Sequence, residues 1–344
     1  MSIPPTTPSD APPPRTNIDF SLNPRLLFAA VGLMVIGCWL AWYFVWRPFP
    51  VDAAIPHYTK AEQLSGHLMS VGSDTLADVM VLSSKGFMTI YPDVTVQLEH
   101  KGSATAPAAL IDGKSQLAPM SRPMTDDEVA AFANKYGYRP TFYRIALDAL
   151  AIYVNKNNPI RGMILQQVDG IFSSTLKRGG PSLETWGSLG LSGEWANKAI
   201  TLYGRDNVSG THQYFKEHAL QNGDFKATVH EDISEYVVDG VANEPSGIGY
   251  SGIGWKTSQV RAVPLGENVG HLVEPTYDNA LDGTYPLARF LYIYVNQQPR
   301  QPLDKLTGEF IKYVLSHEGQ EAIVQAKFFP LPAKIVAETL SGKN

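Results

Sequence analysis

Two stretches far apart in the sequence share one strand pattern: residues 147–155 read LDALAIYVN and residues 290–296 read FLYIYVN. Both are rich in β-branched or aromatic side chains, and both end in asparagine. Along the chain they alternate with another short apolar run, 94–98, and with helical patterns at 125–136 and 307–315. This alternation predicts an α/β fold. The two stretches are either corresponding strands of two lobes or strands that both cross between lobes, and the sequence does not choose.

Length and composition narrow the class of protein. The chain has 344 residues with 44% hydrophobic and 18% charged side chains, and its net charge is −5. This length predicts two domains or lobes with a sizeable core. The acidic balance argues against a nucleic-acid partner, which needs a broad basic face. A single cysteine, Cys38, excludes an intramolecular disulfide and cysteine-rich metal sites.

The N-terminal part differs from the rest. Residues 1–25 are rich in proline and predict a disordered tail. Residues 26–46 (LLFAAVGLMVIGCWLAWYFVW) carry no charge and match the about 30 Å of a bilayer core, which predicts a transmembrane anchor. Alternatively, VIGC at 35–38 resembles a bacterial lipobox, which would make Cys38 a lipidated first residue. The apolar residues that follow Cys38 favour the retained anchor.

Several catalytic signatures fail. GKS at 113–115 lacks the glycine that a phosphate-binding P-loop needs at position 108, and GYSGI at 249–253 does not close the nucleophile-elbow pattern. The histidines form no HExxH motif. The sequence therefore predicts no cofactor, no metal and no enzymatic activity.

Small hydroxyl residues beside glycine recur at expected helix starts. The segments are SVGSDTLAD at 70–78, KGSATAP at 101–107 and GRDNVSGT at 204–211. Each alone predicts a helix N-cap. Together, with Arg205 in the third, they favour an oxyanion site, because amides, hydroxyls and an arginine fork can share the oxygens of one anion.

The order of these motifs resembles the substrate-binding proteins of phosphate-specific ABC transporters, over roughly residues 64–332. The matching motifs are GSDT at 72–75, GS at 102–103, SRPM at 121–124, DALAIYVN at 148–155, GR at 204–205 with SGT at 209–211, PSGIGY at 245–250, YPL at 285–287, SHEGQ at 316–320 and FPLP at 329–332.

The resemblance implies a type II periplasmic-binding-protein fold, in which two α/β lobes joined by crossing hinge strands close over one phosphate. The implied segments are a disordered tail at 1–25, an anchor at 26–46, a linker at 47–63, lobe I at 64–146, lobe II at 147–248, a returning part of lobe I at 249–335 and a C-terminal tail at 336–344. The implied phosphate ligands are Ser73, Thr75, Leu76 through its amide, Ser103, Ser121, Arg122, Arg205, Ser209, Gly210 and Thr211.

One position departs from well-studied members of the family. Where they have an aspartate that accepts the proton of monohydrogen phosphate and repels sulfate, this chain has Ser121, followed by Arg122. We therefore expect weaker rejection of sulfate, unless Asp74 or Asp148 supplies the acceptor from another direction.

The predicted function is capture of inorganic phosphate for an ABC permease, by a single-pass protein of the inner membrane whose binding domain lies in the periplasm or outside the cell. One alternative is a membrane-tethered phosphate sensor or scaffold. Another is binding of a different tetrahedral oxyanion such as sulfate. An enzyme acting on phosphate esters would need a nucleophile or metals that the sequence does not signal.

Overall fold

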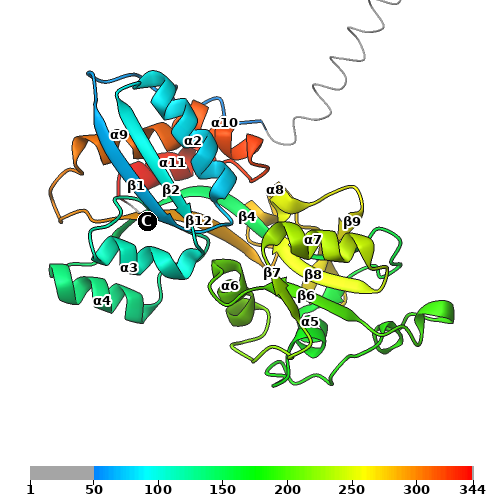
Figure 1. Cartoon of the computed structure of the whole chain (residues 1–344). Coiled ribbons are helices and arrows are strands. Elements are labelled where there is room, and N and C mark those ends of the chain that lie inside the picture. The colour runs from blue at the N-terminus through cyan, green and yellow to red at the C-terminus, as the bar shows by residue number, and fades with distance from the viewer. Residues whose placement is uncertain (1–49, 343–344) are drawn as a thin grey trace, which may run out of the picture. The chain divides into compact units, whose positions relative to one another are not determined.

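The computed structural model describes residues 50–342 (Figure 1). The predicted tail, the predicted anchor at 26–46 and Cys38 lie outside the described residues. Among residues 50–342, no helix is both long and apolar enough to cross a membrane.

Helices and strands alternate along the described chain, which confirms the α/β prediction. The strands are β1 (Gly66–Gly72), β2 (Val94–His100), β3 (Ala118–Met120), β4 (Thr141–Asn155), β5 (Met163–Ile164), β6 (Thr201–Arg205), β7 (His230–Asp232), β8 (Gly247–Gly252), β9 (Val260–Ala262), β10 (Leu265–Asn268), β11 (His271–Val273) and β12 (Ala288–Val295). The α-helices are α2 (Ala77–Ile90), α3 (Ala106–Ile111), α4 (Asp126–Tyr136), α5 (Leu165–Phe172), α6 (Gly210–His218), α7 (Ser234–Asn243), α8 (Tyr277–Leu281), α9 (Lys305–Val314), α10 (His317–Gln325) and α11 (Ala333–Leu340).

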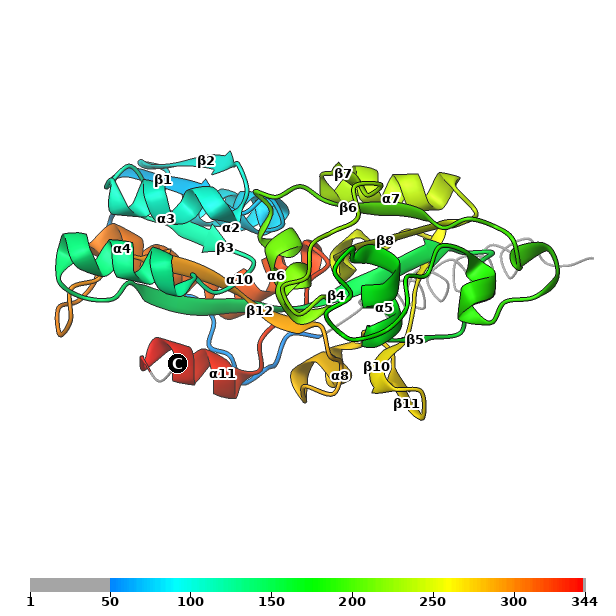
Figure 2. The same cartoon turned by 90° about the horizontal axis from the view of Figure 1, so that it is seen from below.

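Strand β4 belongs to both lobes. Its first part pairs antiparallel with β12, so that Ala149 lies opposite Ala288. Its last part pairs with β8 and β9 on the other side of the molecule. Figure 2 shows β4 as one continuous strand between the two groups of helices. The two repeated sequence stretches are therefore neighbours in one sheet, and their interpretation as corresponding strands of separate lobes is wrong.

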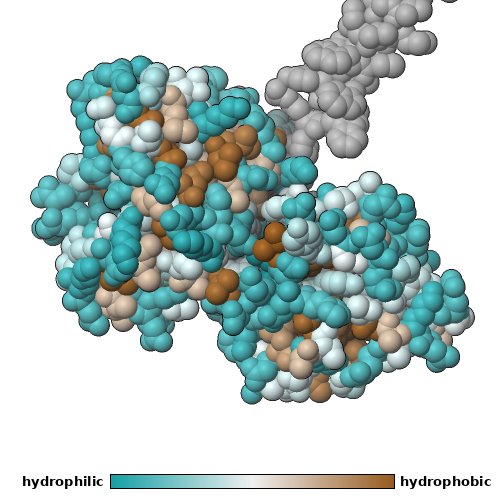
Figure 3. Space-filling view, viewed as in Figure 1, coloured by the Kyte–Doolittle hydropathy of each residue, from teal (hydrophilic) through white to brown (hydrophobic). Residues whose placement is uncertain are grey.

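The first lobe contains the parallel pair β1 and β2, strand β3 beside β12, and helices α2, α3, α4, α9, α10 and α11 (Figure 1). The second lobe contains β8, β6 and β7, with α5, α6 and α7. Residues 145–155 of β4 are all buried, because elements of both lobes cover this part of the strand. The surface seen in Figure 3 is mainly hydrophilic, with apolar side chains in small separate patches.

Two segments lie elsewhere than the sequence suggested. Residues 249–273 were expected to return to the first lobe, but β9 pairs with the far end of β4 and β10 pairs with β5, so they stay with the second lobe. The return begins at α8, where the ring of Tyr277 lies 5.7 Å from that of Phe329, and continues with β12. Residues 336–340, expected in a C-terminal tail, form the end of α11 because Val336 is buried in the core.

Part of the expected linker packs on the first lobe. Ile55 is only 1% exposed, and the side chain of Asp52 accepts a hydrogen bond from the backbone N–H of Ala333 at 2.9 Å. The N–H of Tyr58 donates to Glu318 Oε2 at 2.8 Å, and His57 Nδ1 lies 2.8 Å from Glu318 Oε1. We call residues 51–61 the strap, because these bonds fasten them across α10 and α11.

Glu318 should make stability depend on pH. Burial raises its pKa, but hydrogen bonds from Tyr58, His57 and Ser316 outweigh this and lower it to about 2, from an ordinary 4.5. The ionised carboxylate therefore stabilises the folded state above about pH 4.5, and this contribution is lost as the pH falls toward 2. Glu318→Gln should reduce the free energy of unfolding at pH 7 by about 1 kcal/mol, a modest value because the side chain is 37% exposed and screened by solvent.

The measurement is urea unfolding of both proteins between pH 7 and pH 2.5, with Glu321→Gln on the same helix as the matched control. The difference between wild type and Glu318→Gln should shrink as the pH falls. A difference that stays constant over this range would mean that the charge of Glu318 has no part in holding the strap.

Candidate functional site

The three glycine and hydroxyl segments meet where the two lobes touch. The loop between β1 and α2 places Thr75 Oγ1 3.0 Å from Thr211 Oγ1, at the start of α6. The turn after β2 lies against the loop before α6, where the N–H of Ala104 donates to the carbonyl of Val208 at 3.3 Å. Residues of both lobes therefore lie together at this point.

Arg205 is the central cation of this site. Its side chain is 0% exposed, and it forms an ion pair with Asp74 from the other lobe. Its Nε donates to the carbonyl of Asp232 at 3.1 Å, and its Nη1 donates to the hydroxyl of Ser234. These bonds hold the guanidinium in one orientation, since an arginine fork fixes direction as well as distance.

Neutral groups support the backbone of Arg205. Its N–H donates to the hydroxyl of Tyr250 at 3.2 Å, and burial raises the pKa of this tyrosine, so the hydroxyl stays protonated. Its carbonyl lies 2.7 Å from His212 Nδ1, and burial lowers the pKa of His212, which favours a neutral ring that donates from Nδ1. Neither group therefore adds a second charge to the backbone around Arg205.

Hydroxyl groups of the first lobe lie against the first turn of α6. Ser103 Oγ accepts a hydrogen bond from the N–H of Ser121 at 3.0 Å and lies 3.1 Å from Ser121 Oγ. A side chain at position 210 would collide with both hydroxyls, so only glycine permits this approach. The N-terminus of α6 therefore meets two serine hydroxyls, a combination suited to an anion.

Only one of the three expected helix caps is made by a side chain. Ser209 Oγ accepts from the N–H of Thr211 at 3.1 Å and caps α6. Helix α2 begins after Leu76 and has no side-chain cap, and the short helical turn at Ser103–Thr105 follows Gly102 without one. The side chains of Ser73, Asp74 and Thr75 are thus left available for other partners.

Arg122 takes a different position from the other candidates. Its two terminal nitrogens donate to the carboxylate of Glu128, each at 2.7 Å, and its Nε donates to Gln213 of α6. The positive charge that the sequence assigned to the ligand is thus balanced by Glu128. In this structure Arg122 bridges the lobes through Gln213 and does not join the cluster around Arg205.

Two buried polar atoms at the site have no hydrogen-bond partner among the described residues, namely Ser73 Oγ and Asp74 Oδ1. Buried polar atoms are nearly always paired, so such atoms point to a ligand or water.

The sequence did not identify the bonds of Arg205 to Asp232 and Ser234, because these two residues belong to no recognisable motif.

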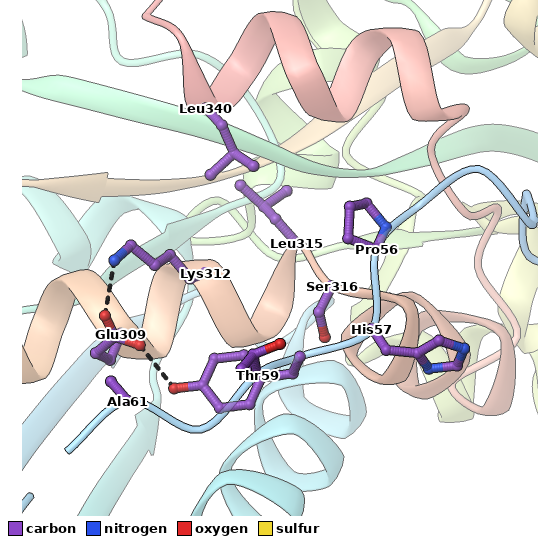
Figure 4. A pocket seen from close by; sticks show the side chains of 10 residues that line it. Pro56, His57, Thr59, Ala61, Glu309, Lys312, Leu315, Ser316 and Leu340 are labelled. Carbon is purple, nitrogen blue, oxygen red and sulfur yellow. Dashed lines mark hydrogen bonds and ion pairs between the residues drawn. The ribbon is translucent and has the colours of Figure 1, made fainter.

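A separate surface pocket of about 330 Å³ lies on the first lobe, lined in part by Tyr58, Glu309 and Lys312 (Figure 4). Glu309 accepts from Tyr58 Oη at 2.8 Å and from Lys312 Nζ at 2.7 Å. None of the residues that line this pocket belongs to the cluster around Arg205. Within residues 50–342, no group of three or more His, Cys, Asp or Glu side chains is arranged to hold a metal ion.

Comparison with known proteins identifies the family. Residues 59–318 match the model of the PBP superfamily domain. The chain is 50% identical over 293 residues to the phosphate-binding protein PstS of Pseudomonas aeruginosa, covering 84% of this chain and 91% of that protein. It is 30% identical over 280 residues to the PstS of Staphylococcus saprophyticus, covering 80% and 84%.

A solved structure agrees with the fold. The ABC-type phosphate transport receptor of Vibrio cholerae superposes with a TM-score of 0.62 at 22% identity, covering 77% of this chain and all of that one. The family model and the two sequence relatives each cover most of the described residues. The chain therefore belongs to the PBP superfamily and, within it, to the family of the phosphate-binding proteins called PstS.

Proposed function

We propose that this chain captures inorganic phosphate outside the cytoplasm and delivers it to the permease of an ABC transporter. The observation that carries the proposal is a fully buried Arg205 at the meeting point of two lobes, surrounded by hydroxyls and by a helix N-terminus. The relatives named as phosphate-binding proteins support phosphate as the anion. The protein binds and releases its ligand without transforming it.

Capture follows from the division of donors between the lobes. Ser73, Thr75, Leu76, Ser103 and Ser121 belong to the first lobe, and Arg205, Ser209, Gly210 and Thr211 belong to the second. One phosphate can contact both sets only when the lobes are together, so binding favours the closed arrangement. Delivery requires that the lobes separate again, which exposes each half of the site to water.

Asp74 supplies the negatively charged acceptor for the proton of monohydrogen phosphate. Ser121 cannot supply it, because a hydroxyl carries no charge. One carboxylate oxygen, Oδ2, pairs with Arg205, while Oδ1 is buried and has no partner within residues 50–342. Both oxygens of Asp148 are already used, by Arg289 and by the N–H of Ile253. A protonated phosphate can donate to Asp74 Oδ1, whereas fully ionised sulfate has no proton to donate and is repelled by the carboxylate.

Removing the central cation should abolish tight binding. Arg205→Ala eliminates charge-assisted hydrogen bonds in a desolvated site and leaves Asp74 without its partner. We expect the Kd for phosphate to rise about 100-fold or more, equivalent to about 3 kcal/mol. Isothermal titration calorimetry measures the change.

Arg178→Ala is the matched control, since Arg178 is a mostly buried arginine of the second lobe that bonds the carbonyls of Ala219 and His218. It should bind phosphate as wild type does. Wild-type affinity in Arg205→Ala would show that the anion binds elsewhere.

Asp74→Asn should weaken discrimination between anions. The amide keeps the shape of the side chain but loses the negative charge that repels sulfate. We expect the ratio of sulfate Kd to phosphate Kd to fall about tenfold or more, because hydrogen bonds to ionised acceptors are the stronger ones.

Competition calorimetry with the two anions gives this ratio. Asp78→Asn, which changes an exposed carboxylate in the first turn of α2, serves as the control. An unchanged ratio in Asp74→Asn would remove Asp74 from the account of selectivity.

A further inference from the structure

A second buried arginine lies directly behind the site, on the strands that connect the lobes. Arg289 on β12 lies opposite Asp148 on β4, and the two residues are 4% and 0% exposed. Arg289 Nε and Nη2 both donate to Asp148 Oδ2, at 3.0 and 2.8 Å. A buried ion pair loses so much hydration that it is weak evidence for stability, so its presence calls for another reason.

Arg289 also reaches the candidate site. Its Nη2 donates to Thr211 Oγ1 at 2.9 Å, and Thr211 Oγ1 lies 3.0 Å from Thr75 Oγ1. A chain of polar groups thus runs from the connecting strands through α6 to the first lobe. Thr211 and Thr75 are themselves 0% and 1% exposed, so water does not compete for these bonds.

The chemistry of arginine gives this chain a direction. A guanidinium has donors only, so Thr211 Oγ1 must accept from Arg289. The hydroxyl hydrogen of Thr211 then points away from the cation, toward Thr75 or toward an anion between the lobes. Without Arg289, the same hydroxyl could turn and present a lone pair to the anion, which is repulsive.

The guanidinium of Arg289 lies between its ion-pair partner and the candidate site. Asp148 is its ion-pair partner, and the ring of Tyr214 lies 5.3 Å from the guanidinium carbon. Its Nη1 is buried and has no hydrogen-bond partner among the described residues. The cation therefore has donors in excess of the acceptors around it, and Thr211 is the acceptor on the side of the site.

We infer that Arg289 is a positioning residue for anion binding, which fixes Thr211 as a hydrogen-bond donor and couples the connecting strands to the site. The inference rests on the proposed function, because it concerns the same anion. The role proposed for Arg289 is exerted through the hydroxyl of Thr211, to which its Nη2 donates.

The test is a double-mutant cycle on the phosphate Kd. One arm is Arg289→Gln with Asp148→Asn, which removes both charges together and so leaves no unpaired buried charge. The other arm is Thr211→Val, which keeps the shape of the side chain but removes the hydroxyl. The third protein combines both arms, and Arg261→Gln is the control, since Arg261 bonds the carbonyls of Asn158 and Ile160.

We expect the neutralised pair to raise the Kd about tenfold in the presence of Thr211 and less than threefold in the Thr211→Val background. The single substitution Arg289→Lys, with Asp148 unchanged, should keep the phosphate Kd within about threefold of wild type. Lysine, like arginine, has hydrogen-bond donors and no acceptor. Equal losses with and without the Thr211 hydroxyl would overturn the inference and leave Arg289 as a structural residue of the connecting strands.

Folding is checked by thermal unfolding of each variant. If the protein with Arg289→Gln and Asp148→Asn does not fold, Arg289→Met with Asp148→Leu replaces it in the same cycle. Apolar residues of similar volume often replace buried ion pairs without loss of stability. Failure of the proposed function is a separate outcome: wild type would then bind no phosphate, whereas failure of this inference leaves wild-type binding intact.

Discussion

The buried charge of Arg205 is the constraint on which the site depends. A guanidinium that is 0% exposed needs a countercharge close by, and here that countercharge, Asp74, comes from the other lobe. The pair therefore links the chemistry of the site to the relative position of the lobes. Hydrogen bonds that Arg205 donates to the carbonyl of Asp232 and the hydroxyl of Ser234 keep the cation in place from the side of its own lobe.

Strand β4 connects the two lobes that this ion pair joins. Because β4 pairs with β12 at one end and with β8 at the other, the two lobes share a covalent and hydrogen-bonded connection. The pair of Asp148 and Arg289 lies on these strands, next to the first turn of α6. The connecting strands and the candidate site are therefore adjacent parts of one polar network.

The sequence predicted the segments of the site better than their partners. Each segment combines glycine with hydroxyl residues after a strand, which is a local pattern that can be recognised without a structure. The bond between Asp74 and Arg205 joins residues 131 positions apart, and that between Arg122 and Gln213 joins residues 91 apart. No local pattern signals such pairs, and the resemblance that placed Arg122 among the ligands carries no information about its bonds to Glu128 and Gln213.

The expected placement of residues 249–273 in the first lobe is wrong for a related reason. Strands β9 and β10 are too short to show a clear strand period, and distant strands decide their pairing.

The strap has a consequence for how movement of this protein can be observed. It ties Asp52 to Ala333 and Tyr58 to Glu318, so the beginning and the end of the described chain are both fastened to the first lobe. The second lobe is then an insertion whose rotation leaves those two ends at a fixed separation. Energy transfer between fluorophores attached near positions 52 and 333 would not change when ligand binds. A reporter pair that detects binding needs one label on the second lobe.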